Sequence, residues 1–109
     1  MKWVIRPAAK ADILRQFRFY LRQGALAAAD GFVDAVDSSV EALCRMPEMG
    51  APRPLGNPLL AGLRSWPVEG FEDLRIYYLV QPDVLRVVRV LHGKRDIVRI
   101  LERERRQLA

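Results

Sequence analysis

The chain has 109 residues, half of them apolar, with 18 Lys and Arg against 13 Asp and Glu and a net charge of +5. This length suits a single globular domain over residues 1–109, and the apolar fraction excludes a disordered chain. One cysteine allows no internal disulfide, and a single histidine adds too few ligands for an ordinary zinc site. We therefore expect no metal and no other cofactor.

The first ten residues, MKWVIRPAAK, lack the apolar core of a signal peptide. No apolar run approaches the roughly 18 residues that a membrane-spanning helix needs. Cysteine usage fits a reducing compartment. We expect a cytoplasmic protein with no membrane partner.

The N-terminal half predicts a strand and two helices. Residues 2–6, KWVIR, are typical of a short strand, and Pro7 then stands where a helix tolerates proline. Apolar side chains recur at helical spacing over residues 8–23, which predicts a first helix that ends at Gly24. They recur in the same way over residues 26–45, which predicts a second helix. The short connection predicts an antiparallel helical hairpin.

Opposite charges line the two predicted helices. Arg22 should fall near Asp30, and Arg15 should fall near Asp37 or Glu41. Exposed pairs of this kind contribute only about 0.2–1 kcal/mol each, so they would select the register of the hairpin more than stabilise it. An acidic patch for a partner is the alternative interpretation of the second helix.

Prolines and glycines crowd residues 47–62, which predicts a loop without helix or strand. Three strands are expected after it, over residues 63–68, 74–80 and 84–92, and the QPD turn joins the last two as an antiparallel hairpin. Asp96 can cap a short last helix. The order β-α-α-β-β-β, followed by that helix, predicts a two-layer α+β fold, with the helical hairpin packed on a small, mostly antiparallel sheet.

Alternation along the last two strands predicts what each face carries. In the last strand Val88, Val90 and His92 should share one face and alternate with Val87, Arg89 and Leu91. One face should pack on the helices and the other should carry the arginines. Tyr77 and Tyr78 should point to opposite faces, with one in the core and one exposed.

Positive charge is concentrated at the C-terminal end. Residues 1–83 hold ten basic and ten acidic side chains, whereas residues 84–109 hold eight and three. This basic segment indicates an anionic partner, either nucleic acid or an acidic protein segment, and the alternative is a solvated surface. Its tail, from about residue 97 to 109, includes Arg105 and Arg106.

The residue types of an endoribonuclease are present without a diagnostic spacing. His92 could act as base or acid, and Arg64 and Arg95 belong to the possible phosphate partners, with Arg75, Arg89 and Lys94. Tyr77 or Tyr78 could donate a proton only with a lowered pKa. Equally, a single histidine at a strand end can fix its neighbours by hydrogen bonds.

The segments PEMGAPRP, GLRSWPV, RIYYLV and VVRVLHGKRDI, in this order behind two helices, resemble the ParE branch of the RelE/ParE toxin superfamily. The resemblance runs from the first strand to about Ile97. It implies the toxin half of a bacterial type II toxin–antitoxin module, in a hetero-oligomer with a cognate antitoxin. That antitoxin is expected to be a ParD-like ribbon-helix-helix protein whose C-terminal part folds along the toxin.

The resemblance also bears on activity. ParE-like members are described as poisons of DNA gyrase, and RelE-like members cut mRNA in the ribosome. His92 and Arg95 match the HGxRD element of the ParE-like toxins, and no tyrosine follows Tyr78, unlike in the RelE-like nucleases. We therefore favour a non-enzymatic gyrase poison with a structural His92. The alternatives are a ribosome-dependent endoribonuclease using His92, Arg64 and Arg95, and an inactive toxin that still binds its antitoxin.

Seven residues are candidates for contact with the target or the antitoxin. They are Arg64, Trp66, Arg89, Lys94, Arg95, Arg99 and Arg103. For Arg64 the alternative is a pair with an acidic loop residue. For Trp66 it is core packing under the helices, which we favour.

Overall fold

The computed structural model describes residues 1–108, with side chains as far as Glu104. The elements are β1 (Lys2–Ile5), α1 (Pro7–Arg22), α2 (Leu26–Arg45), β2 (Ala51–Pro52), a 3-10 helix (Pro58–Leu60), β3 (Arg64–Val68), β4 (Phe71–Gln81), β5 (Val84–His92) and α3 (Ile97–Leu108). The strands form one sheet in the order β1-β5-β4-β3-β2. The β1–β5 pair is parallel and the other pairs are antiparallel. The predicted α+β fold is confirmed.

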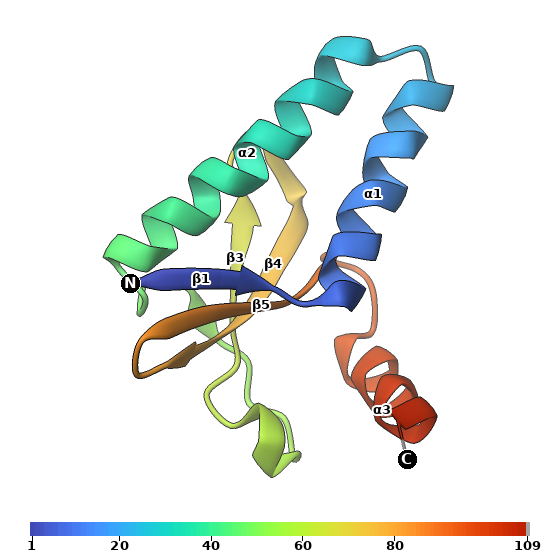
Figure 1. The fold of residues 1–109 in the computed structure, drawn as a ribbon. Coiled ribbons are helices and arrows are strands. Elements are labelled where there is room, and N and C mark those ends of the chain that lie inside the picture. Colours follow the sequence, from blue (N-terminus) through green and yellow to red (C-terminus); the bar gives the residue numbers. More distant parts are fainter. Residues whose placement is uncertain (109) are drawn as a thin grey trace.

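The helical hairpin forms where the sequence predicts it. Pro7 occupies the first turn of α1, and Gly24, with φ of 73°, ends the helix in the left-handed conformation that favours glycine. Figure 1 shows α1 and α2 joined at the top of the view and spreading apart toward the sheet. No helix among the described residues is both long and apolar enough to cross a membrane.

Each face of the sheet has its own core. The helix-side core packs α1 and α2 on the sheet and includes Phe32, Val36, Val40 and Leu43 of α2. The α3-side core lies on the opposite face, where Leu60, Leu63, Tyr77, Val88, Leu91, Ile97 and Leu101 pack together. Asp96 caps α3 as predicted, since its Oδ1 accepts the backbone N–H of Arg99 at 3.1 Å.

The face opposite the helical hairpin does carry arginines, as predicted, since Arg75 pairs with Leu91 and Arg86 with Leu79, but α3 and the loop before β3 cover this face. The predicted alternation along β5 is correct from Val90 to His92 and wrong at Val87 and Val88. A β-bulge shifts the register near Val88, so Val87 and Val90 both enter the helix-side core while Val88 and Leu91 enter the α3-side core.

The two adjacent tyrosines of β4 do point to opposite faces, as predicted. Tyr78 lies in the helix-side core and Tyr77 in the α3-side core. The expectation that one of them is exposed is wrong, because both faces of the sheet are covered. Each tyrosine is at most 1% exposed.

The loop at residues 47–62 holds two short elements that the sequence did not predict. Ala51 and Pro52 pair with β3 as the edge strand β2, where proline is tolerated because no further strand needs its missing N–H. Pro58–Leu60 form the 3-10 helix, and the Asn57 side chain accepts the N–H of Leu59 at 2.9 Å. Elements of two or three residues are too short to show a periodic pattern of apolar residues, so the sequence could not predict them.

The predicted ion pairs across the hairpin are not formed. Arg15 instead contacts Asp12, one turn earlier on its own helix, at 3.3 Å. Asp30, Asp37 and Glu41 lie exposed on α2, and none of them is within salt-bridge distance of a cation among the described side chains. Exposed pairs contribute too little to set how two helices meet, and apolar packing decides instead.

Candidate functional site

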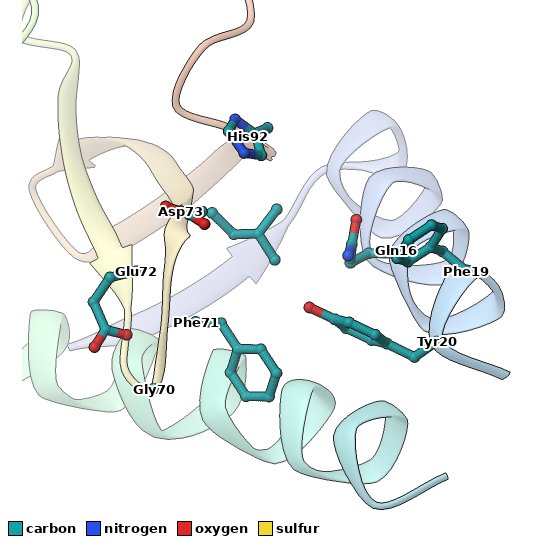
Figure 2. A pocket seen from close by; sticks show the side chains of 9 residues that line it. Gln16, Phe19, Tyr20, Gly70, Phe71, Glu72, Asp73 and His92 are labelled. Carbon is teal, nitrogen blue, oxygen red and sulfur yellow. The ribbon is translucent and has the colours of Figure 1, made fainter. Parts of the chain in front are cut away.

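A cleft of about 500 Å³, here called the His92 cleft, opens between α1 and the turn that joins β3 to β4. Its lining includes Gln16, Tyr20, Phe71 and His92. In Figure 2 the Tyr20 hydroxyl and the Gln16 amide point into the opening, the Phe71 ring lies below it, and His92 stands at the upper rim. The cleft therefore combines polar side chains with an aromatic wall.

Tyr20 and Phe71 of that wall pack against the ring of Phe32, which is buried in the helix-side core and does not line the cleft. Tyr20 of α1, Phe32 of α2 and Phe71 of β4 have ring centroids 5.5–5.9 Å apart. Such tilted and edge-to-face contacts are favoured by the charge distribution of the rings. Since each ring comes from a different element, the wall is fixed by the same packing that holds the hairpin on the sheet.

His92 is exposed and already has a structural partner. Its Nδ1 accepts the backbone N–H of Lys94 at 3.2 Å, so in the neutral ring the proton resides on Nε2. The same turn is fixed by Gly93 N–H donating to the Asp73 carbonyl at 2.7 Å and by Arg95 N–H donating to the His92 carbonyl at 2.9 Å. The histidine thus orders the turn after β5 while it lines the cleft.

Arg64 and Tyr78 hold the loop after α2. The Arg64 guanidinium donates to the carbonyls of Glu48 and Gly50 at 3.1 and 2.7 Å. The Tyr78 hydroxyl donates to the Pro47 carbonyl at 2.7 Å and accepts the Gly50 N–H at 2.9 Å. Arg64 therefore has backbone partners rather than the acidic loop side chain considered from the sequence.

The environment of Tyr78 does not suit a proton donor. Burial raises the pKa of its hydroxyl, and the hydrogen bond from Gly50 and the charge of Arg64 lower it by less. The hydroxyl proton is also engaged with the Pro47 carbonyl. The lowered pKa that acid catalysis would require of Tyr78 is not found.

The three nuclease candidates are not brought together. Arg64 pairs with Tyr78, and His92 pairs with Leu74, four residues away along β4. At about 3.3 Å per residue their backbones are separated by roughly 13 Å along the strand, besides lying on different strands. Arg95 lies near His92 in sequence, in the exposed turn, while the Arg64 side chain contacts the loop after α2.

Arg89 is part of a buried ion-pair network. The Asp12 carboxylate, fully buried, accepts from Arg89 Nε and Nη2 at 2.7 and 2.8 Å and from the Val90 N–H at 3.0 Å. Hydrogen bonding to Asp12 raises the Arg89 pKa, and burial opposes this. Glu104 of α3 binds Arg6 through Oε1 at 3.1 Å, and its buried Oε2 lies 3.8 Å from Arg89 Nη1 with no hydrogen bond.

Sequence reasoning missed Asp12 and Glu104. A signal for Asp12 was present, because it lies one turn after the buried Ala9 and so falls within the apolar side of α1. A charged residue in that position needs a buried partner of opposite charge. Nothing in the sequence identified Arg89 as that partner.

The remaining candidates divide by exposure. Core packing of Trp66 is confirmed, since its half-buried ring lies against the helix-side core. Lys94, Arg95, Arg99 and Arg103 are exposed. The side chains of Arg105 and Arg106 lie outside the described residues.

No group of three or more His, Cys, Asp or Glu in the described part of the chain is placed to hold a metal ion.

These features define a small α+β protein with a mixed five-stranded sheet and a basic surface around its C-terminal helix. The family model of the ParE toxin of the type II toxin–antitoxin system parDE matches residues 4–97, and the chain belongs to this family. A solved structure of the chromosomal ParDE system from P. aeruginosa has a similar fold, with a TM-score of 0.67 and 21% identity. The match covers 84% of this chain and 95% of that one. No curated protein matches in sequence.

Proposed function

We propose that this ParE-family toxin inhibits DNA gyrase and so blocks replication, and that a ParD-like antitoxin neutralises it. The observation that carries the proposal is the family match over residues 4–97. The separation of Arg64 from His92 supports a binding activity over RNA cleavage. Since the proposed target acts on the chromosome, the toxin would work in the cytoplasm.

The proposal is tested with purified protein in a gyrase supercoiling and DNA-cleavage assay. We expect loss of supercoiling and accumulation of cleaved DNA. Unchanged supercoiling at high molar excess of toxin would reject gyrase as the target. Removal of α3 is a poor test of the basic surface, because Ile97 and Leu101 belong to the α3-side core.

A charge-neutralised variant locates the active surface more cleanly. Lys94, Arg95, Arg99 and Arg103 are replaced together by Gln. The matched control replaces four other exposed arginines, Arg18, Arg22, Arg45 and Arg53, and so removes the same charge. Loss of gyrase inhibition in the first variant alone would assign the contact to the turn after β5 and to α3.

A ribosome-dependent endoribonuclease is the second candidate, and one observation favours it. His92 is exposed at a cleft, with its Nε2 available and a tyrosine hydroxyl opposite. For this activity His92→Ala should abolish toxicity and mRNA cleavage in cell-free translation. A His92→Ala protein that remains fully toxic would count against it, provided that its urea midpoint matches the wild type.

The outer side of the helical hairpin is the surface that we propose for the antitoxin. Leu14, Phe17 and Leu21 follow helical spacing along α1, and Leu14 and Leu21 are 46% and 40% exposed. Leu14 and Phe17 line a groove of about 620 Å³ with Val33 of α2. An amphipathic antitoxin helix binds such a groove through its apolar face.

This surface is tested by binding of the cognate antitoxin, for which a short reading frame upstream is the place to look. Leu14→Glu should weaken binding by about tenfold or more, as expected for a central apolar contact. Leu59→Glu is the matched control, since Leu59 is 80% exposed in the 3-10 helix. Equal effects of the two substitutions would reject the groove.

A further inference from the structure

A second cleft, of about 420 Å³, lies between α1, α3 and the end of β5. Four of its lining residues are arginines, and we call it the arginine cleft. Arg15 comes from α1, Arg89 from β5, Arg95 from the turn after β5, and Arg103 from α3. The fold thus gathers in one place four cations that are spread over most of the sequence.

The carboxylates at this cleft are already paired. Asp12 lies beneath it and binds Arg89 and Arg15, and Glu104 binds Arg6 through Oε1. Among the described side chains, the four lining arginines together with Arg6 face the two carboxylates of Asp12 and Glu104, which leaves a net charge of +3.

Two of the arginines supply most of the uncompensated charge. Among the described side chains, neither Arg95 nor Arg103 has a carboxylate within 4 Å, and both are exposed. Their guanidinium groups are available to an anionic ligand at the edge of the cleft.

We propose that the arginine cleft binds the phosphodiester backbone of a nucleic acid, without reading its sequence. The planar guanidinium fork binds phosphate oxygens in pairs, which makes arginine well suited to this ligand. Ala8 and Ala11 of α1 line the cleft with short side chains, so a phosphate can approach closely. No Asn or Gln among the described side chains lines it, so the side chains that commonly read adenine are missing from this part of the lining.

An acidic protein segment fits this cleft less well. As far as the side chains are described, its apolar lining consists of two alanines and the half-buried Ile100, which offer no deep pocket for an aromatic or aliphatic anchor. The basic surface also continues beyond the cleft, because Arg99 precedes Arg103 by one helical turn. A track of exposed cations suits a long, regularly charged backbone. The contact needs no gyrase and is independent of the target proposed above.

Fluorescence anisotropy of a labelled DNA duplex of about 20 base pairs tests the proposal on the full chain. Sequence-independent binding should give a Kd of about 10⁻⁴–10⁻⁶ M near physiological salt. Ala11→Glu places a carboxylate in the cleft at an exposed helix position and should weaken binding by about tenfold or more. Ala27→Glu makes the same change at an exposed site on α2 and should alter binding by less than about twofold.

The salt dependence provides a second, independent readout. Each phosphate contact contributes about 0.9 to the slope of log K against log salt concentration. Arg95→Gln with Arg103→Gln should therefore reduce the slope by about 1.8. Arg18→Gln with Arg22→Gln removes the same charge from the far end of α1 and should leave the slope nearly unchanged.

The results of these experiments distinguish binding at the arginine cleft from general attraction by the positive charge of the chain. Equal losses in the cleft variants and their controls would overturn the proposal in favour of diffuse attraction. Binding of an acidic peptide of about 20 residues in the cleft, with no DNA bound, would overturn it in favour of a protein partner. An RNA duplex of the same sequence shows whether the ligand is DNA or RNA. The site is supported if the chain binds either nucleic acid and Ala11→Glu abolishes that binding. If Ala11→Glu fails to fold by circular dichroism, the salt slopes still decide.

Discussion

Among the described side chains, the helix-side core holds twelve buried residues from five elements, whereas the α3-side core holds seven. The smaller core is supplemented by ion pairs, because Glu104 of α3 reaches Arg6 and lies near Arg89. Elements with few buried apolar contacts open at lower free-energy cost than the rest of a protein. The two faces of one sheet thus differ in kind: apolar packing holds the helical hairpin, and packing together with charge holds α3.

The largest effect should come from Asp12, which lies between the two regions and joins α1 to β5. In Asp12→Ala, Arg89 loses its buried partner, and we expect the free energy of unfolding to fall by about 3–5 kcal/mol. Arg15→Ala is the control, because this side chain is 65% exposed and should contribute less than about 1 kcal/mol. Urea denaturation measures both. A loss below about 1 kcal/mol for Asp12→Ala would mean that packing alone joins the two regions.

Leucine truncations compare the two cores directly. Leu43→Ala in the helix-side core and Leu101→Ala in the α3-side core should each cost about 2–5 kcal/mol. Leu43 should lie near the upper end, because it is 0% exposed within the larger core, whereas Leu101 is 6% exposed. Hydrogen exchange should show faster opening of α3 amides in Leu101→Ala and not in Leu43→Ala. Equal costs and uniform exchange would remove the distinction between the cores.

The adjacent tyrosines of β4 provide a pair of matched variants, one for each face. Tyr78→Phe leaves the Gly50 N–H and the Pro47 carbonyl without their partner and should cost about 1–3 kcal/mol. Tyr77→Phe should cost less than about 0.5 kcal/mol, since the Tyr77 hydroxyl makes no hydrogen bond to the described residues. Thermal unfolding distinguishes the two, and a larger effect at Tyr77 would reverse their assigned roles.

Long elements with a clear period could be predicted from the sequence, and α2 and β5 have the predicted bounds, 26–45 and 84–92. The bulge at Val88 could not, because the adjacent Val87 and Val88 are both apolar and either can enter either core, yet one extra residue changes which face each of them joins. β2 was missed because its two residues become a strand only by pairing with β3.

The candidate site was less predictable than the fold, for a related reason. The exposed cations Lys94 and Arg95 follow from local sequence, since they belong to a turn after a strand. The different roles of Arg64 and Arg89 depend on partners 14 and 77 residues away. Charge alone cannot distinguish an arginine bound to a buried carboxylate from one that is available to a ligand, and only the three-dimensional arrangement separates them.

The smallest expected effect on stability comes from the repulsion between neighbouring carboxylates on the exposed surface of α2. The pKa of Asp37 is raised, first by partial burial and then by Asp34 and Glu41. The folded state therefore binds this proton more tightly than the unfolded chain, and the ionised carboxylate makes folding less favourable. This penalty is absent below the ordinary pKa of 3.8, where both states are protonated, and it is complete above the raised value.

Asp37→Asn should accordingly stabilise the fold at pH 7 by about 0.2–0.5 kcal/mol for each like-charge pair relieved, with no gain near about pH 3. Ser38→Asn, at the next exposed position, controls for the helix propensity of asparagine. Urea midpoints at the two pH values measure the difference. A gain of equal size at both would show that helix propensity, and not repulsion, sets the stability of this surface. A gain confined to neutral pH would make the contrast with Asp12 explicit: a buried carboxylate stabilises this fold through its partner, and an exposed cluster of carboxylates weakens it.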